Sequence, residues 1–253
     1  MIQSIDRAAK IMNLLRGARR LGIGELAAAL ELPPSTVHGL VKSLQAHGLV
    51  AQEKNGNRYA LGPALVKLSS VYLDTLDVRA HSIRWMHDLS QRTGLATRLG
   101  APLLDEVLVI HHDRRPDGSE QMPETGLTIP AHASALGKIL LAYDDELLRE
   151  VTATPLIELT AETVTDLAVL RGELETVRET ALAYENEEAV VGESSIAAPV
   201  CGETGAVIAA VAVVLPSMDW PVTDAVLHDL RESARSISRV LGGPTWPPST
   251  RRP

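Results

Sequence analysis

The stretch from Pro33 to Gln52 combines short hydrogen-bonding side chains with basic groups and contains no acidic residue. Its apolar residues recur at helical spacing, which leaves the opposite face of the helix to polar side chains. A solvated helix commonly carries Glu and Lys pairs, whereas this face suits the negative potential and the base edges of a DNA major groove. On this face, the residues that we expect to contact DNA are Ser35, Thr36, His38 and Lys42.

A predicted hairpin directly follows this helix. Residues 49–51 and 58–60 are short strand-like runs, and Asn55-Gly56 between them is a dipeptide typical of tight hairpin turns. Basic side chains near such a tip can reach phosphates or a minor groove. Outside the helix, the residues that we expect to contact DNA are Arg7, Lys54 and Arg58.

A small scaffold must present these side chains. One apolar stripe from Leu26 to Leu30 and another from Val37 to Leu44 predict two helices, and the prolines at 33 and 34 end the first of them. Ser35 can cap the second helix by accepting a backbone N–H. Together with the hairpin, these helices predict a winged helix-turn-helix. The alternative is a small helical domain with a solvated hairpin and no ligand.

The charge of the chain is divided unevenly. Residues 1–60 hold eight Lys/Arg and four Asp/Glu, whereas the remainder holds sixteen Lys/Arg and twenty-eight Asp/Glu. The two parts therefore carry +4 and −12, which together give the net charge of −8. The acidic total does not argue against DNA binding, because the field of the binding domain decides the interaction.

Composition places the chain among globular proteins. At 253 residues, with 45% apolar content, it is long enough for two domains with separate cores. The single cysteine, Cys201, excludes an intramolecular disulfide and a multi-cysteine zinc site and indicates a reducing compartment. No apolar window reaches the length of a transmembrane helix, and the start has no signal-peptide core, so we expect a cytoplasmic protein with no membrane partner.

Beyond the hairpin the hydrophobic pattern changes twice. Residues 64–92 predict a helix, interrupted near Asp77, that either pairs two copies of the chain or packs against its own domain. From Leu95 onward, short apolar runs alternate with helical segments, so distant strands must share one antiparallel sheet covered by helices. The predicted strands are 96–101, 106–111, 194–200 and 206–215, and the predicted helices are 133–143, 145–151, 165–180 and 223–241. This α+β chain divides into a winged helix-turn-helix at 1–62, a linker helix at 63–94, a sheet domain at 95–243 and a flexible tail at 244–253.

Three groups in the sheet domain resemble reactive sites. His111-His112-Asp113 suggests metal or acid–base chemistry, but neighbouring residues of a strand point to opposite faces, so the two rings cannot easily share one ion. The Ala-Leu-Gly-Lys sequence ending at Lys138 lacks the glycine spacing of a phosphate-binding loop. The acidic run 185–188 is typical of a solvated loop, with Glu185 as the residue expected to face inward. We therefore expect no catalytic residue, no metal and no cofactor.

Five motifs occur along the chain in a characteristic order. They are QSIDRAAKIMNLL, LPPSTVHGLVKSLQAHGLV, YALG, IPAHASALGKILLA and SIAAPVCGETGAVIAAVAV. Through them the chain resembles the IclR-type bacterial transcription regulators over essentially its whole length. Three further stretches, STVHG, VRAHSIRW and VIHHDRRPDGSEQ, look like the glycerol operon regulators of actinobacteria within that family.

The resemblance implies that the sheet domain is a GAF-like domain that binds a small-molecule effector. It also implies homodimers or dimers of dimers that bind palindromic operators in double-stranded DNA. Gly39 stands where many members have Arg, so a guanidinium that could read guanine is missing there. Carried over by position, the effector contacts fall on Met122, Ile129, Ala135, Leu136, Glu185, Ser195, Ala212 and Val214.

The resemblance to glycerol operon regulators favours glycerol or glycerol 3-phosphate as the effector. Ser195 and Glu185 can recognise hydroxyl groups, and Arg98 with one of the rings of His111 or His112 can meet a phosphate. Of the two rings, we assign His111 to the predicted site.

Two alternatives stay open at this point. Ala212 and Val214 stand where members that bind small keto acids have Ser, which disfavours a glyoxylate-like ligand and keeps an aromatic or branched carboxylate as a candidate. An enzyme with a DNA-binding regulatory head is a function of another class, but the sequence has no nucleophile paired with a base and no cofactor fingerprint. The sequence therefore predicts a ligand-responsive transcription regulator, a repressor of a catabolic operon, rather than an enzyme.

Overall fold

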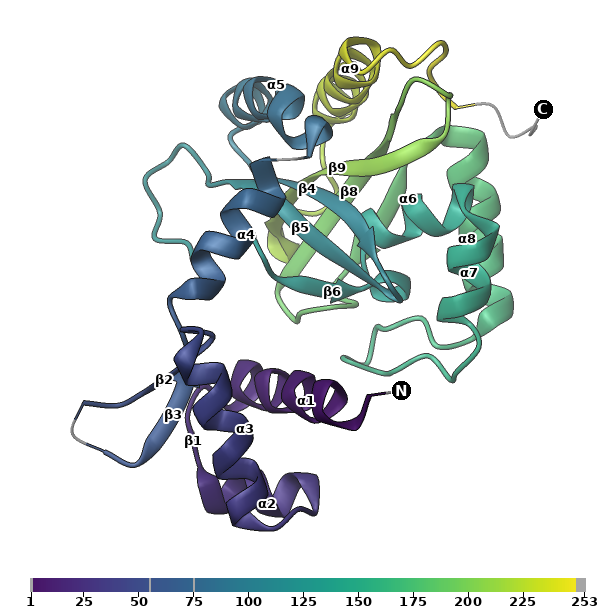
Figure 1. Cartoon of the computed structure of the whole chain (residues 1–253). Coiled ribbons are helices and arrows are strands. Elements are labelled where there is room, and N and C mark those ends of the chain that lie inside the picture. Colours follow the sequence, from purple (N-terminus) through teal and green to yellow (C-terminus); the bar gives the residue numbers. More distant parts are fainter. Residues whose placement is uncertain (1, 55, 75, 249–253) are drawn as a thin grey trace. The chain divides into compact units, whose positions relative to one another are not determined.

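Two units, Met1–Thr75 and Leu76–Pro253, each enclose a core of their own in the computed structural model (Figure 1). The structure describes residues 2–54, 56–74 and 76–248. The predicted linker helix is two helices, α4 (Ala64–Asp74) in the first unit and α5 (Asp77–Thr93) in the second. Because α5 packs within the second unit, that unit begins at Leu76 and not at the predicted residue 95.

The first unit consists of helices and a small sheet. The helices are α1 (Gln3–Ala18), α2 (Ile23–Leu30) and α3 (Pro34–Ala46), followed by α4. The strands β1 (Leu21–Gly22), β2 (Val50–Gln52) and β3 (Arg58–Leu61) form an antiparallel sheet in the order β1-β3-β2. This arrangement is the predicted winged helix-turn-helix, and apolar side chains of α1, α2 and α3 form its core.

Both apolar stripes predicted for the helix-turn-helix lie on the core side of their helices. Leu26 of α2 and Val37 and Val41 of α3 are almost fully buried. The predicted cap of the second helix is wrong, because α3 begins at Pro34 with Pro33 in the N-cap position. Proline is favourable in the first turn since it needs no hydrogen-bond acceptor for its nitrogen, and this start leaves Ser35 within the helix.

The predicted hairpin is formed by β2 and β3. Gln52 pairs with Tyr59, and the backbone N–H of Glu53 donates to the carbonyl of Arg58 at 3.0 Å. Asn55, half of the dipeptide predicted to form the turn, lies outside the described residues.

The second unit is built on one six-stranded antiparallel sheet. Its order is β6-β5-β4-β9-β8-β7. The strands are β4 (Ala96–Leu103), β5 (Glu106–Asp113), β6 (Thr128–Pro130), β7 (Ala183–Asn186), β8 (Glu193–Cys201) and β9 (Val207–Pro216). The four predicted strands correspond to β4, β5, β8 and β9, whereas the edge strands β6 and β7 were not predicted.

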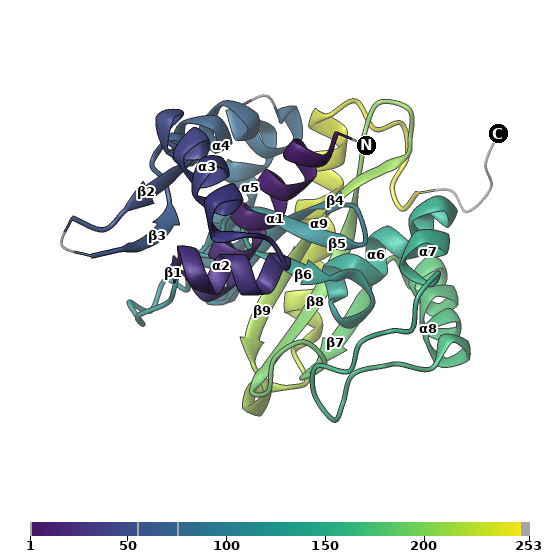
Figure 2. The same cartoon turned by 60° about the horizontal axis from the view of Figure 1, so that its bottom comes forward.

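Helices cover both faces of this sheet (Figures 1 and 2). On one face α5 packs beside α9 (Asp224–Val240), and on the other α6 (Ala135–Tyr143) lies against the central strands. Two more helices, α7 (Asp145–Val151) and α8 (Leu167–Thr180), pack against α6. Short 3-10 turns at Ala131–Ala133 and Ser217–Asp219 complete the unit. The predicted α+β class is confirmed by this layered arrangement.

The described part of the predicted tail is in contact with the second unit. The indole nitrogen of Trp246 donates to the carbonyl of Pro199 at 2.9 Å, and the guanidinium of Arg235 lies 5.3 Å from the centre of the Trp246 ring. Residues 244–248 therefore do not form the free tail that the sequence predicted, and residues 249–253 lie outside the described part. Among the helices that the structure describes, none is long and apolar enough to cross a membrane.

Gly137 allows the first turn of α6 to approach the 3-10 turn that precedes it. A Cβ atom at this position would lie 2.0 Å from the carbonyl oxygen of Ala131 and 2.4 Å from its Cα. By contrast, Gly172 in α8 has no atom within 4 Å of such a Cβ. Replacement of these two glycines by alanine should therefore have opposite effects on stability.

We expect Gly137→Ala to destabilise the second unit by about 3 kcal/mol, because the added methyl group meets backbone atoms that cannot move aside. Gly172→Ala is the matched control and should stabilise α8 by up to about 1 kcal/mol. All three tryptophans, Trp85, Trp220 and Trp246, lie in the second unit, so denaturant unfolding followed by tryptophan fluorescence measures this unit. Equal stability of Gly137→Ala and the unchanged protein would contradict the close approach.

Candidate functional site

One face of α3 carries the predicted DNA-contacting residues. Ser35, His38 and Lys42 are exposed, and Thr36 is half-buried at the edge of the same face. Since the apolar residues of α3 face the core, its exposed side is polar, and the helix contains no acidic residue. The structure thus places the four predicted residues of this helix on one exposed side.

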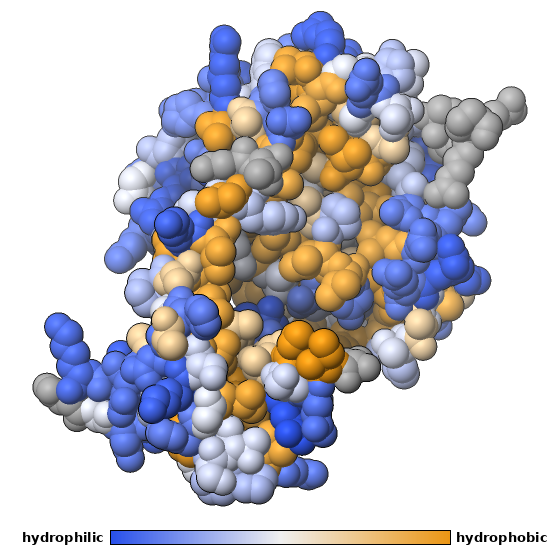
Figure 3. All heavy atoms as spheres, in the orientation of Figure 1, coloured by the Kyte–Doolittle hydropathy of each residue, from blue (hydrophilic) through white to orange (hydrophobic). Residues whose placement is uncertain are grey.

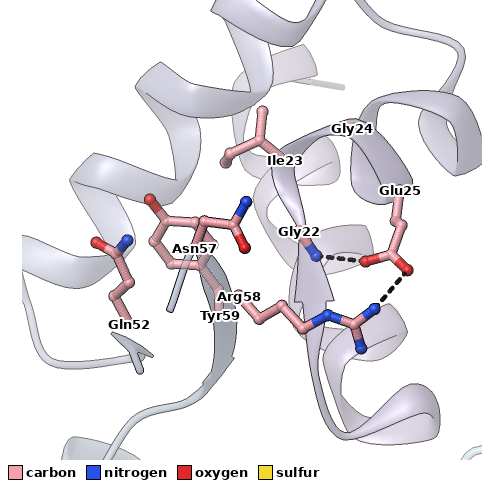
Figure 4. Close-up of a pocket in the computed structure, with 8 residues that line it drawn as sticks. All are labelled: Gly22, Ile23, Gly24, Glu25, Gln52, Asn57, Arg58 and Tyr59. Atoms are coloured by element: carbon pink, nitrogen blue, oxygen red, sulfur yellow. Dashed lines mark hydrogen bonds and ion pairs between the residues drawn. The ribbon is translucent and has the colours of Figure 1, made fainter. Parts of the chain in front are cut away.

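Arg58, at the start of β3 in the β2–β3 hairpin that forms the wing, is directed toward α2 and not toward the tip of the hairpin (Figure 4). Its Nη2 atom lies 3.4 Å from Oε1 of Glu25, and the other carboxylate oxygen of Glu25 accepts the backbone N–H of Gly22 at 2.6 Å. A hollow of about 370 Å³ lies beside these groups, lined also by Gln52 and Asn57. Both charged side chains are about half exposed, and an exposed pair of this kind contributes little stability, so Arg58 can exchange Glu25 for a phosphate.

The two other predicted basic residues occupy different positions. Lys54 is exposed near the tip of the hairpin, where the sequence placed it. Arg7 is half-buried on α1.

In the second unit, Arg98 is the centre of a buried polar cluster. Its Nε donates to Oε2 of Glu124, while Nη1 and Nη2 donate to the two carboxylate oxygens of Glu193 at 2.7 and 3.0 Å. Burial alone would lower the pKa of Arg98, but the hydrogen bonds to the two carboxylates outweigh it and raise that pKa. The guanidinium is therefore held as a cation between two acids.

His112 belongs to this cluster, whereas His111 does not. His112 is the cross-strand partner of Arg98, so the two share one face of the sheet, and its Nε2 lies 3.6 Å from Oε2 of Glu124. His111 pairs with Leu99 on the opposite face, and its Nε2 lies 3.2 Å from Oδ2 of Asp113. The structure therefore brings His112, and not the assigned His111, together with Arg98, because the pairing of β4 with β5 decides which ring lies on that face.

Glu185 of β7 and Ser195 of β8 are cross-strand partners, in agreement with the family resemblance, which placed both residues in one effector site. The Ser195 hydroxyl donates to Oε2 of Glu185 at 2.8 Å, and Oε1 of Glu185 accepts the backbone N–H of Glu188 at 2.7 Å. Only 3% of Glu185 is exposed, and burial raises its pKa to about 7. Glu185 thus faces inward as predicted, whereas the expectation of a solvated position is wrong for Glu188, because its carboxylate is buried against Nζ of Lys138 at 2.5 Å.

The remaining predicted effector contacts divide into buried and exposed positions. Ala212 and Val214 of β9 are cross-strand partners of Arg98 and Ser195, respectively, so they lie on the same face. The first turn of α6 covers that face, with Leu136 close to Gly100 of β4. The other predicted contacts are the buried Ala135, the half-buried Ile129 on β6 and the exposed Met122.

Two members of this cluster, Glu124 and Glu193, were not predicted, and His112 was named only as the alternative to His111. An arginine inside an apolar strand does indicate that carboxylates must lie nearby, because a buried charge needs a partner. The pattern of one sequence cannot say which carboxylates these are. Among the residues that the structure describes, no cluster of three or more His, Cys, Asp or Glu side chains has the arrangement of a metal site.

Comparisons with known proteins agree over both units. Residues 4–54 match the IclR helix-turn-helix domain, and residues 70–239 match the family described as bacterial transcriptional regulator IclR C-terminal. The glycerol operon regulatory protein of Streptomyces griseus is 38% identical over 246 residues, covering 95% of this chain and 97% of the relative. The HTH-type transcriptional regulator XynR of Escherichia coli (strain K12) is 32% identical, covering 96% and 99% of the two chains.

Solved structures show the same fold. An IclR transcriptional regulator from Alicyclobacillus acidocaldarius matches with a TM-score of 0.81 and 27% identity, covering 96% of this chain and 100% of that one. An IclR homolog from Microbacterium hydrocarbonoxydans, complexed with 4-hydroxybenzoate, matches with a TM-score of 0.79 and 25% identity, covering 94% and 99%. Fold and comparisons together define a DNA-binding transcription regulator that responds to a small molecule. The chain belongs to the IclR family of bacterial transcriptional regulators.

The raised pKa of Glu185 predicts how its burial changes the stability of the second unit with pH. In the folded state this pKa is about 7 against an ordinary value of 4.5, so the folded protein holds the proton more tightly than the unfolded chain. The stabilisation is present at low pH and is lost as the pH rises from about 4.5 to 7, by up to about 3 kcal/mol.

Glu185→Gln cannot ionise, so we expect it to lose this part of the pH dependence. Denaturant unfolding followed by tryptophan fluorescence between pH 5 and pH 8 measures it, with Glu187→Gln in the following turn as the matched control. A pH profile of Glu185→Gln that parallels that of the unchanged protein would show that Glu185 is not buried in the folded state.

Proposed function

We propose that this regulator is a repressor of a catabolic operon that binds a palindromic operator as a homodimer or as a dimer of dimers. We further propose that glycerol or glycerol 3-phosphate is the effector. The observation that carries the proposal is the polar lining on one face of the second sheet, where Arg98, Glu185 and Ser195 are buried on the side of α6. Burying such groups costs free energy, and a small polar ligand gives a reason for placing them there.

We place the DNA contacts on α3 and the wing. Ser35, Thr36 and His38 near the start of α3 are proposed to contact base edges, because the first residues of a recognition helix approach the bases most closely. Lys42, Lys54 and Arg58, together with Arg7 of α1, are proposed to contact phosphates. These roles are supported by the exposed, acid-free side of α3 and by the weak pairing of Arg58.

A dimer is supported by apolar side chains exposed on the first unit. On α4, the exposed fractions of Val66, Leu68 and Val71 are 68%, 58% and 60%, and apolar atoms gather at the surface over this helix (Figure 3). Ile2 and Ile5 at the start of the chain are also exposed. Large exposed apolar patches mark association surfaces, and a symmetric dimer matches a palindromic operator.

The glycerol assignment is supported by the relatives from Streptomyces griseus and Streptomyces coelicolor, both named glycerol operon regulatory proteins, at 38% and 36% identity. The hydroxyl of Ser195 and the carboxyl of Glu185 can exchange hydrogen bonds with the hydroxyl groups of a polyol. Arg98 can hold a phosphate by charge-assisted hydrogen bonds once a carboxylate leaves it.

An aromatic or branched carboxylate is the second candidate. Ala212 and Val214 place small apolar side chains between Arg98 and Ser195 on the sheet. An aromatic ring can pack on such a surface, and the Microbacterium hydrocarbonoxydans relative is complexed with 4-hydroxybenzoate. This candidate keeps the same site and changes only the body of the ligand.

Lys42→Ala should weaken DNA binding and flatten its salt dependence. Each phosphate contact contributes about 0.9 to the slope of log affinity against log salt, so loss of one contact in each protomer of a dimer should reduce the slope by about 2. The affinity for an operator duplex selected from a random pool can be measured between 50 and 300 mM salt by fluorescence anisotropy. Arg149→Ala, an exposed change on α7, is the control. An unchanged slope for Lys42→Ala would show that α3 does not lie along the phosphates as proposed.

Calorimetric titration tests the effector. We expect glycerol or glycerol 3-phosphate to bind the full chain and to release it from the operator duplex, because Glu185, Ser195 and Arg98 can recognise their polar groups. Glu185→Gln should weaken this binding by about tenfold, the equivalent of about 1.4 kcal/mol, and Glu187→Gln should not. Binding and release by 4-hydroxybenzoate, with no response to either glycerol compound, would replace the glycerol assignment with the second candidate.

A further inference from the structure

In the second unit, the guanidinium of Arg98 binds two carboxylates at the same time. The side chain of Arg98 is only 10% exposed, and every one of its nitrogen atoms donates to Glu124 or Glu193. The cluster therefore carries one more negative than positive charge. A further anion cannot enter it without adding a second uncompensated charge to a buried site, which is costly.

His112 lacks a partner in this cluster. Its side chain is 3% exposed, and its Nε2 atom has no hydrogen-bond partner among the described residues. The nearest charged group is Oε2 of Glu124 at 3.6 Å, which is beyond hydrogen-bond distance. A buried nitrogen without a partner is unfavourable, so Nε2 of His112, beside the Arg98 guanidinium, can gain a hydrogen bond from a polar group of a ligand.

The two carboxylates are held with different strength. Glu193 accepts two hydrogen bonds from Arg98 and stands at the start of β8, where its own backbone is paired on both sides, with Glu187 and Val190. Glu124 accepts one hydrogen bond and lies between Arg98 and His112, in the segment 114–127 that joins β5 to β6. Most residues of that segment are exposed. Glu124 is therefore the carboxylate that can leave.

The same face offers hydroxyl recognition at its other end. Arg98 of β4 is followed across the sheet by Ala212 and Val214 of β9 and by Ser195 of β8, which bonds Glu185. Two strand spacings, about 10 Å, separate β4 from β8. An elongated small molecule with an anionic group at one end and a hydroxyl group at the other has polar partners at both ends and a small apolar surface between them.

We propose that Glu124 occupies the position of the effector's anionic group, so that a hydroxylated carboxylate or phosphate ester binds by replacing Glu124 on Arg98 and thereby releases the segment 114–127. The inference rests on the proposed effector site and names the chemical class of its ligand. Exchange of Glu124 for a carboxylate, or for a phosphate ester that keeps one proton, leaves the charge of the cluster unchanged, which avoids the cost of adding an anion. Nε2 of His112 then lies beside the incoming group and can donate to it.

Glu124→Gln tests the exchange, because the amide keeps the shape of the side chain but competes weakly for the guanidinium. The probes are glycerol 3-phosphate, 4-hydroxybenzoate, inorganic phosphate and the uncharged glycerol, titrated calorimetrically into the full chain. We expect at least one of the three anions to bind Glu124→Gln about tenfold more tightly than the unchanged protein, the equivalent of about 1.4 kcal/mol, with the affinity for glycerol unaltered. Asp117→Asn removes the same charge from an exposed position of the same segment and should change nothing.

Hydrogen exchange supplies a second measurement that does not need the variant. The same anion, at saturation, should speed amide exchange within residues 114–127 of the unchanged protein, whereas glycerol should not. If the variant does not fold, this measurement alone decides, and an unchanged exchange rate overturns the proposal.

The outcomes separate this inference from the glycerol assignment. A gain in affinity for 4-hydroxybenzoate or phosphate, without binding of either glycerol compound, would end the glycerol assignment and leave the exchange standing. Binding of glycerol with no gain for any anion in Glu124→Gln would overturn the exchange and leave the glycerol assignment standing. Failure of all three anions to bind either protein would also overturn the exchange.

Discussion

A guanidinium buried in the face of a β-sheet requires carboxylates beside it, and this requirement organises much of the second unit. Arg98 forms ion pairs with Glu193 at the start of β8 and with Glu124 in the segment before β6, so it connects three parts of the chain that are distant in sequence. On the neighbouring strand, burial lowers the pKa of His112, and the charge of Arg98 acts in the same direction. Ala212, opposite Arg98 on β9, and Val214 then form the small apolar surface between this cluster and Ser195.

The features that could be predicted from the sequence are those that local patterns specify. Helical spacing of apolar residues gave α2 and α3, because the core of the helix-turn-helix needs one apolar stripe from each. Long apolar runs gave the four inner strands, since a strand covered on both faces is apolar throughout. The short edge strands β6 and β7 escaped prediction because three or four residues carry too little pattern.

The errors concern information that lies in pairing between distant segments. Alternation along β5 showed that only one of His111 and His112 could face the site. The register of β5 with β4 places His112 on the face that carries Arg98. Glu188 lies in an acidic run that resembles a solvated loop, and its burial depends on an ion pair with Lys138, fifty residues earlier in the chain. Ser35 is a different case, because the prolines before it moved the start of α3 to Pro34.

Gly39 has a consequence for how such a regulator can evolve. It lies on the exposed side of α3, and a Cβ atom placed there would have no other atom within 4 Å. A side chain other than proline can therefore be introduced at this position without disturbing the helix-turn-helix core, and most residues also favour a helix more than glycine does. After a gene duplication, one copy could acquire a new operator by a single codon change while its fold and its effector site stayed as they were.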